Sequence, residues 1–134
     1  MIRVTVDSNI FISALEFQGI GLRLIAMARS GSIRIDTSDA ILAETIGVLR
    51  DKFHWDAYRL HFARLELLKI THRVQPTQTI AIADDPDDDR VLECAVTAGS
   101  DYILSYDKDL LRLNEFAGIK IVTASDFLLF WPHL

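Results

Sequence analysis

The segment "ADDPDDDR" at residues 83–90 contains five aspartates, which is the densest group of carboxylates in the chain. The chain has 14 lysines and arginines against 19 aspartates and glutamates, a net charge of −5, and leaving out these five aspartates would leave 14 of each sign. Crowded carboxylates repel one another unless cations or hydrogen bonds compensate them. Mg²⁺ and Mn²⁺ take oxygen ligands. The segment therefore indicates either a solvated helix start or part of a metal site.

Two further acids follow predicted strands. Asp7 comes directly after "IRVTV" at 2–6, where apolar and polar residues alternate with the period of a strand. Asp107 stands shortly after "YILS" at 102–105. The carboxyl ends of parallel strands share one edge of a sheet, and ligands bind beyond that edge. We therefore expect both carboxylates at the edge where a site would lie.

Two more acids lie on predicted helices. Glu44 is on the flank of the apolar face of a helix over 38–50, for which Ser38 is a good N-cap. Asp89 lies in the first turns of a helix over 86–98, and this helix leads into the strand at 102–105. Four acids from four segments can thus converge on one point, where one or two divalent cations would compensate their charge.

Most of the acidic segment also has a purely structural interpretation. Asp85 suits the N-cap, Pro86 the first helical position, and Asp87 and Asp88 the first turn, where acids favour the positive end of the helix dipole. Asp89 lies past the cap, and it is the aspartate of this segment that we expect to bind metal. Asp87 and Asp88 remain alternatives for that role.

The alternation of strands and helices predicts one α/β domain over residues 1–134 with parallel strands and helical crossovers. Half of the residues are hydrophobic, enough for an ordinary core. We interpret residues 71–79 as a loose connection. The remaining predicted elements are strands at 33–35 and 119–123 and helices at 21–31, 56–69, 108–116 and 125–131.

Composition excludes several classes of protein. With Cys94 as its only cysteine, the chain cannot form an intrachain disulfide, which fits a reducing compartment. None of the four histidines pairs with Cys94 at zinc-ligand spacing. The start has no signal-peptide pattern, and the apolar stretch 127–131 is too short to cross a bilayer. We expect a cytoplasmic protein without membrane contact.

Four motifs occur in order along the chain: "VDSNIFISAL" (6–15), "ILAETIGVL" (41–49), "DPDDDRVLECA" (85–95) and "YILSYDKDLL" (102–111). Together they resemble the PIN-domain family, in particular the small single-domain members of toxin–antitoxin systems that are relatives of the VapC toxins. The resemblance covers essentially the whole chain, and it implies a three-layer α/β/α sandwich with a central, mainly parallel sheet. The family consists largely of metal-dependent ribonucleases.

The resemblance also implies roles for individual residues. The first acid of the family falls on Asp7, with Asn9 bracing it, and the second falls on Glu44. The third falls on Asp89, which begins "DRVLECA", and the fourth on Asp107 in "SYDKDL". These four acids are the implied catalytic residues and the implied ligands of one or two Mg²⁺ or Mn²⁺ ions.

The match departs from the family pattern at two positions. Ser105 stands where threonine is usual, and either hydroxyl can hydrogen-bond a carboxylate. Leu110 replaces a phenylalanine, which we interpret as a packing change. Glu93 and Asp109 are extra acids near the expected site, and Glu93 shares a helix face with Asp89, one turn away.

The implied activity is metal-dependent hydrolysis of RNA phosphodiester bonds, with a small antitoxin and a second copy of the chain as partners. The apolar tail 127–134 is a candidate surface for such a partner, although packing into the core explains it equally well. The main alternative is a catalytically silent PIN domain that binds RNA or a protein. A haloacid dehalogenase-type phosphatase requires a second aspartate where Asn9 stands, and a receiver domain requires an acidic pair after the first strand.

Overall fold

The computed structural model of the chain describes residues 1–131 and has a six-stranded sheet in the order β3-β2-β1-β4-β6-β5. All pairings are parallel except that of β5 with β6. This confirms the predicted α/β class and its mainly parallel sheet. The strands are β1 (Ile2–Val6), β2 (Ile33–Ser38), β3 (Thr71–Val74), β4 (Tyr102–Leu104), β5 (Glu115–Phe116) and β6 (Ile119–Val122).

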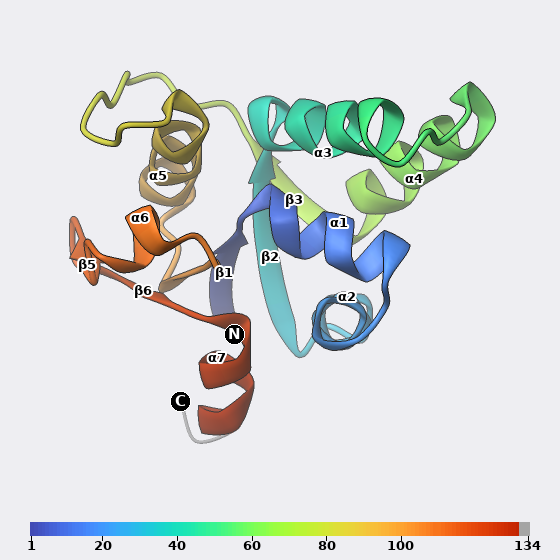
Figure 1. Cartoon of the computed structure of the whole chain (residues 1–134). Helices are drawn as coiled ribbons and strands as arrows, with labels where there is room; N and C mark the ends of the chain where they lie inside the picture. Colours follow the sequence, from blue (N-terminus) through green and yellow to red (C-terminus); the bar gives the residue numbers. More distant parts are fainter. Residues whose placement is uncertain (132–134) are drawn as a thin grey trace.

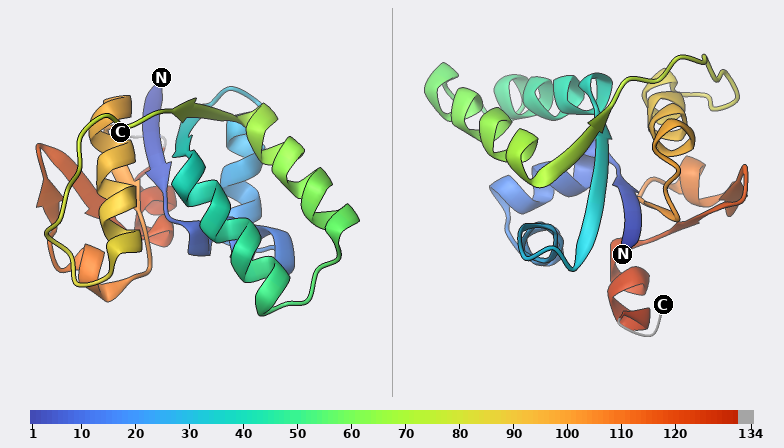
Figure 2. Two further views of the ribbon diagram at one scale, coloured as in Figure 1. Left: turned by 90° about the horizontal axis from the view of Figure 1, so that it is seen from above. Right: turned by 180° about the vertical axis from the view of Figure 1, so that it is seen from behind.

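Helices lie on both faces of the sheet, which makes the three layers expected of the sandwich. Figures 1 and 2 show α1 to α4 on one side and α5 with α6 on the other. α7 contacts α2, and α5 packs on β1, β2 and β4. The helices are α1 (Ser8–Glu16), α2 (Ile20–Arg29), α3 (Asp39–Asp51), α4 (Ala57–Ile70), α5 (Pro86–Ala98), α6 (Lys108–Leu111) and α7 (Ala124–Phe130).

The structure differs from the predicted elements in three places. α1 and β3 were not anticipated: α1 lies within the first motif, and β3 is an edge strand whose His72 and Arg73 are exposed. The helix predicted over 108–116 ends at Leu111, because the chain turns through Asn114 at a φ of 63° and forms β5. Of the apolar tail, α7 buries Phe127 and leaves Leu129 exposed, and residues 132–134 lie outside the described residues.

Local sequence explains both ends of α5. The Asp85 side chain caps the helix by accepting a hydrogen bond from the backbone N–H of Asp87, and Pro86 occupies the first turn. At the other end Gly99 takes the left-handed conformation, with φ 66° and ψ 39°, which glycine adopts without steric cost. The predicted cap, start and stop of this helix are confirmed.

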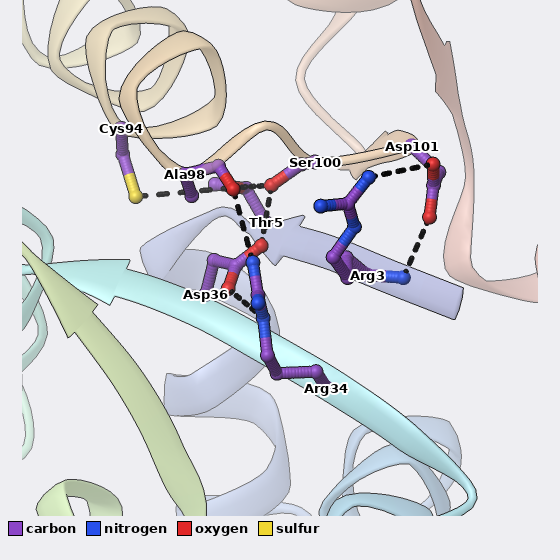
Figure 3. A network of polar contacts seen from close by, with 8 residues as sticks. All are labelled: Arg3, Thr5, Arg34, Asp36, Cys94, Ala98, Ser100 and Asp101. Atoms are coloured by element: carbon purple, nitrogen blue, oxygen red, sulfur yellow. Dashed lines mark hydrogen bonds and ion pairs between the residues drawn. The ribbon is translucent and has the colours of Figure 1, made fainter. Parts of the chain in front are cut away.

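A network of buried polar groups fastens the carboxyl end of α5 to the sheet (Figure 3). Arg34 on β2 donates to the Ala98 carbonyl at 3.0 Å and to the fully buried Asp36 carboxylate at 2.7 Å. The other Asp36 oxygen accepts from the Ser100 hydroxyl at 2.6 Å. Because that hydroxyl has only one proton, Thr5 must be the donor in its 2.7 Å contact with Ser100.

Among residues 1–131, no single helix is long and apolar enough to cross a membrane. α1 and α2 pass that test only as a pair, and the pair is bent by 100°. Both helices contribute side chains such as Phe11 and Leu24 to the buried core.

Candidate metal site

The order of the strands brings Asp7 and Asp107 to the same place. β1 lies between β2 and β4, so the chain continues to one side of β1 through β2 and β3 and to the other through β4 and β6. Such a reversal of strand order opens a crevice beyond the carboxyl ends of the strands. Asp7 directly follows β1, its N–H donates to the Leu104 carbonyl at the end of β4, and Asp107 follows three residues after that carbonyl.

A third aspartate, Asp88 in the first turn of α5, completes the group. One carboxylate oxygen of each of Asp7, Asp88 and Asp107 lies within 4.8 Å of the other two. Asp7 and Asp88 are each only 4% exposed, and Asp107 is half-buried. Oδ2 of Asp88 is buried without a hydrogen-bond partner among the described residues. Three converging carboxylate oxygens, together with an unsatisfied oxygen on Asp88, fit a hard divalent cation.

Hydroxyl and backbone groups orient two members of this trio. The Ser105 hydroxyl donates to Oδ2 of Asp7 at 2.8 Å and accepts from the N–H of Asp107 at 2.9 Å. The Ser8 hydroxyl lies 3.4 Å from Oδ1 of Asp7, and the N–H of Asp109 donates to Oδ1 of Asp107 at 2.8 Å. Ser105 therefore links the Asp7 carboxylate to the backbone of Asp107, and its hydroxyl bonds a carboxylate as expected for a residue at the threonine position of the motif.

The electrostatics of the trio favour a bound cation. Burial, and to a smaller extent the charges of Asp107 and Asp7, raise the pKa of Asp88 to about 7. Burial also raises the pKa of Asp7, with a smaller upward effect from Asp107, against the downward effect of the hydrogen bond from Ser105. The charge of Asp107 thus makes ionisation of both Asp7 and Asp88 less favourable, and a divalent cation would reverse that cost.

Glu44 lies beside the trio without being one of its three oxygen donors. Partial burial raises its pKa to about 7, with further upward effects from the charges of Asp87, Asp7 and Asp85 and a downward effect from a hydrogen bond with Ser8. Glu44 therefore shares the electrostatic field of the site from α3. It is placed where it can extend the ligand set or hold a proton near neutral pH.

The structure directs Asp89 away from the trio. Its Oδ1 accepts hydrogen bonds from the backbone N–H groups of Ile82 and Ala83, at 3.1 and 2.9 Å. Consecutive residues of an α-helix point about 100° apart, so Asp88 and Asp89 cannot aim at the same point. Sequence reasoning placed Asp89 in the ligand set, whereas the geometry brings Asp88 to Asp7 and Asp107.

The supporting residues predicted from the sequence also differ in their placement. Asn9 is exposed on α1, and the described side-chain hydrogen bonds to the Asp7 carboxylate come from Ser8 and Ser105. Glu93 faces the loop that Asp89 contacts, accepting from the N–H of Ile80 at 2.8 Å. Sequence reasoning missed Ser8, whose signal was its place directly after the first acid.

Comparisons with known proteins identify the family of the chain and show that its fold is shared with solved structures. A family model described as "PIN domain" matches residues 3–109. A chain of VapBC-1 from nontypeable Haemophilus influenzae superposes with a TM-score of 0.63 at 15% identity, covering 92% of this chain and 99% of that one. A chain of VapBC2 from Rickettsia felis, solved bound to a DNA fragment from their promoter, gives 0.65 at 12% identity, with 91% and 98% covered. No curated protein sequence matched.

Proposed function

The chain belongs to the PIN-domain family, and on that premise we propose that it is a metal-dependent endoribonuclease that hydrolyses RNA phosphodiester bonds. The observation that carries the proposal is the trio of Asp7, Asp88 and Asp107, whose oxygens converge at the sheet edge. Within residues 1–131, the buried Oδ2 of Asp88 has no hydrogen-bond partner. Buried carboxylates arranged in this way cost stability, which is a common property of functional sites.

The residues present fit a Mg²⁺ or Mn²⁺ ion. Asp7, Asp88 and Asp107 would hold it, and Glu44 stands where it can complete the shell or serve a second ion. When bound, such an ion supplies charge neutralisation at a phosphate and polarises water. Ser105 keeps the Asp7 carboxylate in one orientation, and Asp109 does the same for Asp107 through its backbone N–H.

The proposed reaction is hydrolysis with inversion at phosphorus. The oxygen of a water molecule forms a bond to the phosphorus, the bond from phosphorus to the 3′ oxygen breaks, and a proton passes to that oxygen. The products carry a 5′-phosphate and a 3′-hydroxyl. Glu44 is the side chain near the trio whose pKa, about 7, suits holding a proton during this exchange.

We further propose that the chain is the toxin of a toxin–antitoxin pair and acts in the cytoplasm. The support is its fold, which resembles chains of two VapBC complexes. A small antitoxin protein is then the expected partner, and a second copy of the chain is the expected self-association. The exposed Leu129 and Phe130 of α7 offer apolar surface for such contacts.

The test is cleavage of end-labelled structured RNAs with Mn²⁺ or Mg²⁺, by the wild type, Asp88→Asn and Asp84→Asn. Asp84 belongs to the same acidic segment and is exposed, so its variant removes the same charge away from the trio. We expect metal-dependent cleavage by the wild type and Asp84→Asn, none by Asp88→Asn, and none with EDTA.

Two outcomes would contradict the proposal. Equal cleavage by the wild type and Asp88→Asn would assign the activity to a contaminant or another site. Absence of cleavage by a wild-type protein that binds Mn²⁺ and RNA would favour the silent PIN domain.

A further inference from the structure

The segment 75–85 between β3 and α5 has no regular secondary structure, yet its last part is fastened to α5 through side chains. Residues 75–85 form the β3–α5 loop. The fastening side chains are Asp89, Arg90 and Glu93, all in the first two turns of α5. None of them belongs to the trio of Asp7, Asp88 and Asp107.

The first fastening is the Asp89 carboxylate. It is 4% exposed, and its Oδ1 accepts from two consecutive backbone N–H groups of the loop, those of Ile82 and Ala83. Hydrogen bonds from backbone N–H groups to an ionised carboxylate are among the stronger ones in proteins. This buried acid is therefore compensated by the loop, whereas the neighbouring Asp88 is not.

The second fastening is one helical turn further along the same face. Glu93, 6% exposed, accepts from the N–H of Ile80 at 2.8 Å and from Arg90 Nη2 at 2.8 Å. The same Nη2 donates to the Ile80 carbonyl at 3.1 Å. Both backbone groups of Ile80 are thus held by a charged pair on α5.

The β3–α5 loop ends at the residue that caps α5. Asp85 accepts the N–H of Asp87 with its side chain and the N–H of Asp88 with its carbonyl. The first turn of a helix has no intrahelical acceptors for these N–H groups. Repulsion between Asp88 and the carboxylates of Asp7 and Asp107 acts to displace this turn, so the position of Asp88 depends on how firmly Asp85 and the loop before it are held.

We propose that Asp89 and Glu93 are positioning residues, which hold the β3–α5 loop on α5 and thereby keep Asp88 facing Asp7 and Asp107. This inference rests on the proposed function, because it assigns to Asp88 the metal contact and to Asp89 the support of that contact. Groups that orient metal ligands are typically worth a factor of about 10 to 100 in metal affinity.

The test measures two quantities on each variant: Mn²⁺ affinity by calorimetry, and hydrogen exchange at the amides of Ile80, Ile82 and Ala83 by NMR. Asp89→Ala removes the acceptor, so we expect faster exchange at Ile82 and Ala83 and Mn²⁺ affinity lower by about tenfold. Asp89→Asn keeps an oxygen that can accept the same N–H groups, so most of the affinity should return, to within about threefold of the wild type.

Asp88→Asn should give the opposite pattern, with Mn²⁺ affinity lower by about a hundredfold or more and loop exchange unchanged. Asp84→Asn is the matched control for the loss of one charge in the segment, and it should alter neither quantity. The comparison of Asp88→Asn with Asp89→Asn remains decisive if Asp89→Ala does not fold, because both asparagine side chains nearly match aspartate in shape.

Two outcomes would overturn the inference while leaving a working metal site. If Asp89→Asn lost as much affinity as Asp88→Asn with the loop still protected, Asp89 would be a ligand. If Asp89→Ala opened the loop without changing Mn²⁺ affinity, the loop would have no part in positioning Asp88. A wild-type protein that bound no Mn²⁺ would instead overturn the proposed metal site and this inference together.

Discussion

A buried carboxylate lies at each end of helix α5, and the two carboxylates differ in whether hydrogen bonds and a cationic side chain compensate their charge. Near the carboxyl end, Asp36 is fully buried and both of its oxygens are satisfied, one by Arg34 and one by Ser100 (Figure 3). At the amino end, Asp88 is nearly as buried, but its Oδ2 has no partner among the described residues, and the charges that raise its pKa are those of other aspartates.

This difference separates an acid that maintains the fold from one that is available for chemistry. A compensated buried carboxylate is fixed in place and strongly coupled to its partners. An uncompensated one raises its pKa and destabilises the folded state until a cation arrives. Burial alone does not distinguish Asp36 from Asp88, whereas hydrogen-bond satisfaction does.

The largest effect should follow from Asp88→Asn, which alters the uncompensated end. Metal-dependent activity should fall by about 10³-fold or more, since a ligand of the proposed metal is lost. The metal-free variant should also be more stable than the metal-free wild type, by about 1 kcal/mol, because one of three mutually repelling carboxylates has been neutralised. RNA cleavage and urea denaturation measure the two effects, and a metal-free variant less stable than the wild type would contradict the comparison.

Asp36→Ala, near the carboxyl end of α5, should lower the stability of the protein, in contrast to Asp88→Asn. It leaves the half-buried Arg34 guanidinium without its carboxylate and the Ser100 hydroxyl without its acceptor. Loss of one partner of a buried pair costs about 3 kcal/mol of unfolding free energy. Urea denaturation with and without Mn²⁺ should give the same loss, and Asp36→Asn, which keeps acceptor capacity, should lose less. A change under 1 kcal/mol would mean that this network is not a structural anchor.

The pH dependence of stability sharpens the contrast further. The pKa values of Asp88 and Glu44 are about 7 in the folded chain, above their ordinary values of 3.8 and 4.5. Their ionised forms are therefore disfavoured by folding, so stability of the metal-free protein should fall as pH rises from about 4 to about 7, by on the order of 2 kcal/mol. Urea denaturation across this pH range tests whether the free energy of unfolding falls as pH rises.

Two controls accompany the pH series. Asp88→Asn should make the fall in stability with pH smaller, because one of the two titrating groups is gone and Glu44 remains. Mn²⁺ affinity should fall as pH drops below about 7, since the ligands must lose protons to bind. A metal-free wild type that gained stability from pH 5 to pH 8 would contradict the assignment of Asp88 as an uncompensated acid.

The smallest effect should come from Asp101→Asn, because Asp101 directly follows Ser100 of the Asp36 network but is exposed. Asp101 pairs with Arg3 at 3.6 Å, with both side chains about 40% exposed. Exposed pairs contribute little because water screens them, so we expect a change below about 0.5 kcal/mol in thermal or urea denaturation. An effect as large as that of Asp36→Ala would show that burial is not what separates the two acids.

Sequence patterns predicted the parts of the fold that depend on local chemistry. The start and end of α5 followed from Asp85, Pro86 and Gly99, each of which has a conformational reason for its place. β3 was missed because an exposed edge strand of four residues has little apolar periodicity, as His72 and Arg73 illustrate. Helix α1 was missed because it lacks clear end signals: its N-cap Asp7 makes no side-chain capping hydrogen bond, and its C-cap is Phe17 where a glycine would mark a stop.

The choice among consecutive aspartates could not be made from sequence. Asp87, Asp88 and Asp89 differ by successive turns of about 100° on the helix, so the phase of α5 decides which one meets Asp7 and Asp107. That phase is normally inferred from the apolar stripe, but α5 buries every residue from Asp88 to Ala95 except the half-buried Arg90. Only tertiary packing on both the sheet and the β3–α5 loop fixes the direction of each carboxylate.

The single cysteine of the chain has a practical consequence. Cys94 lies on α5 between Asp88 and the Gly99 cap, and its side chain has no exposed surface. Burial raises the pKa of its thiol to about 12. Thiolate is the reactive form toward alkylating reagents, so the folded protein should resist iodoacetamide at neutral pH. The rate of alkylation then reports how often α5 lifts from the sheet. Alkylation of Cys94 in the native chain thus measures the opening of the helix that bears Asp88, without any introduced label.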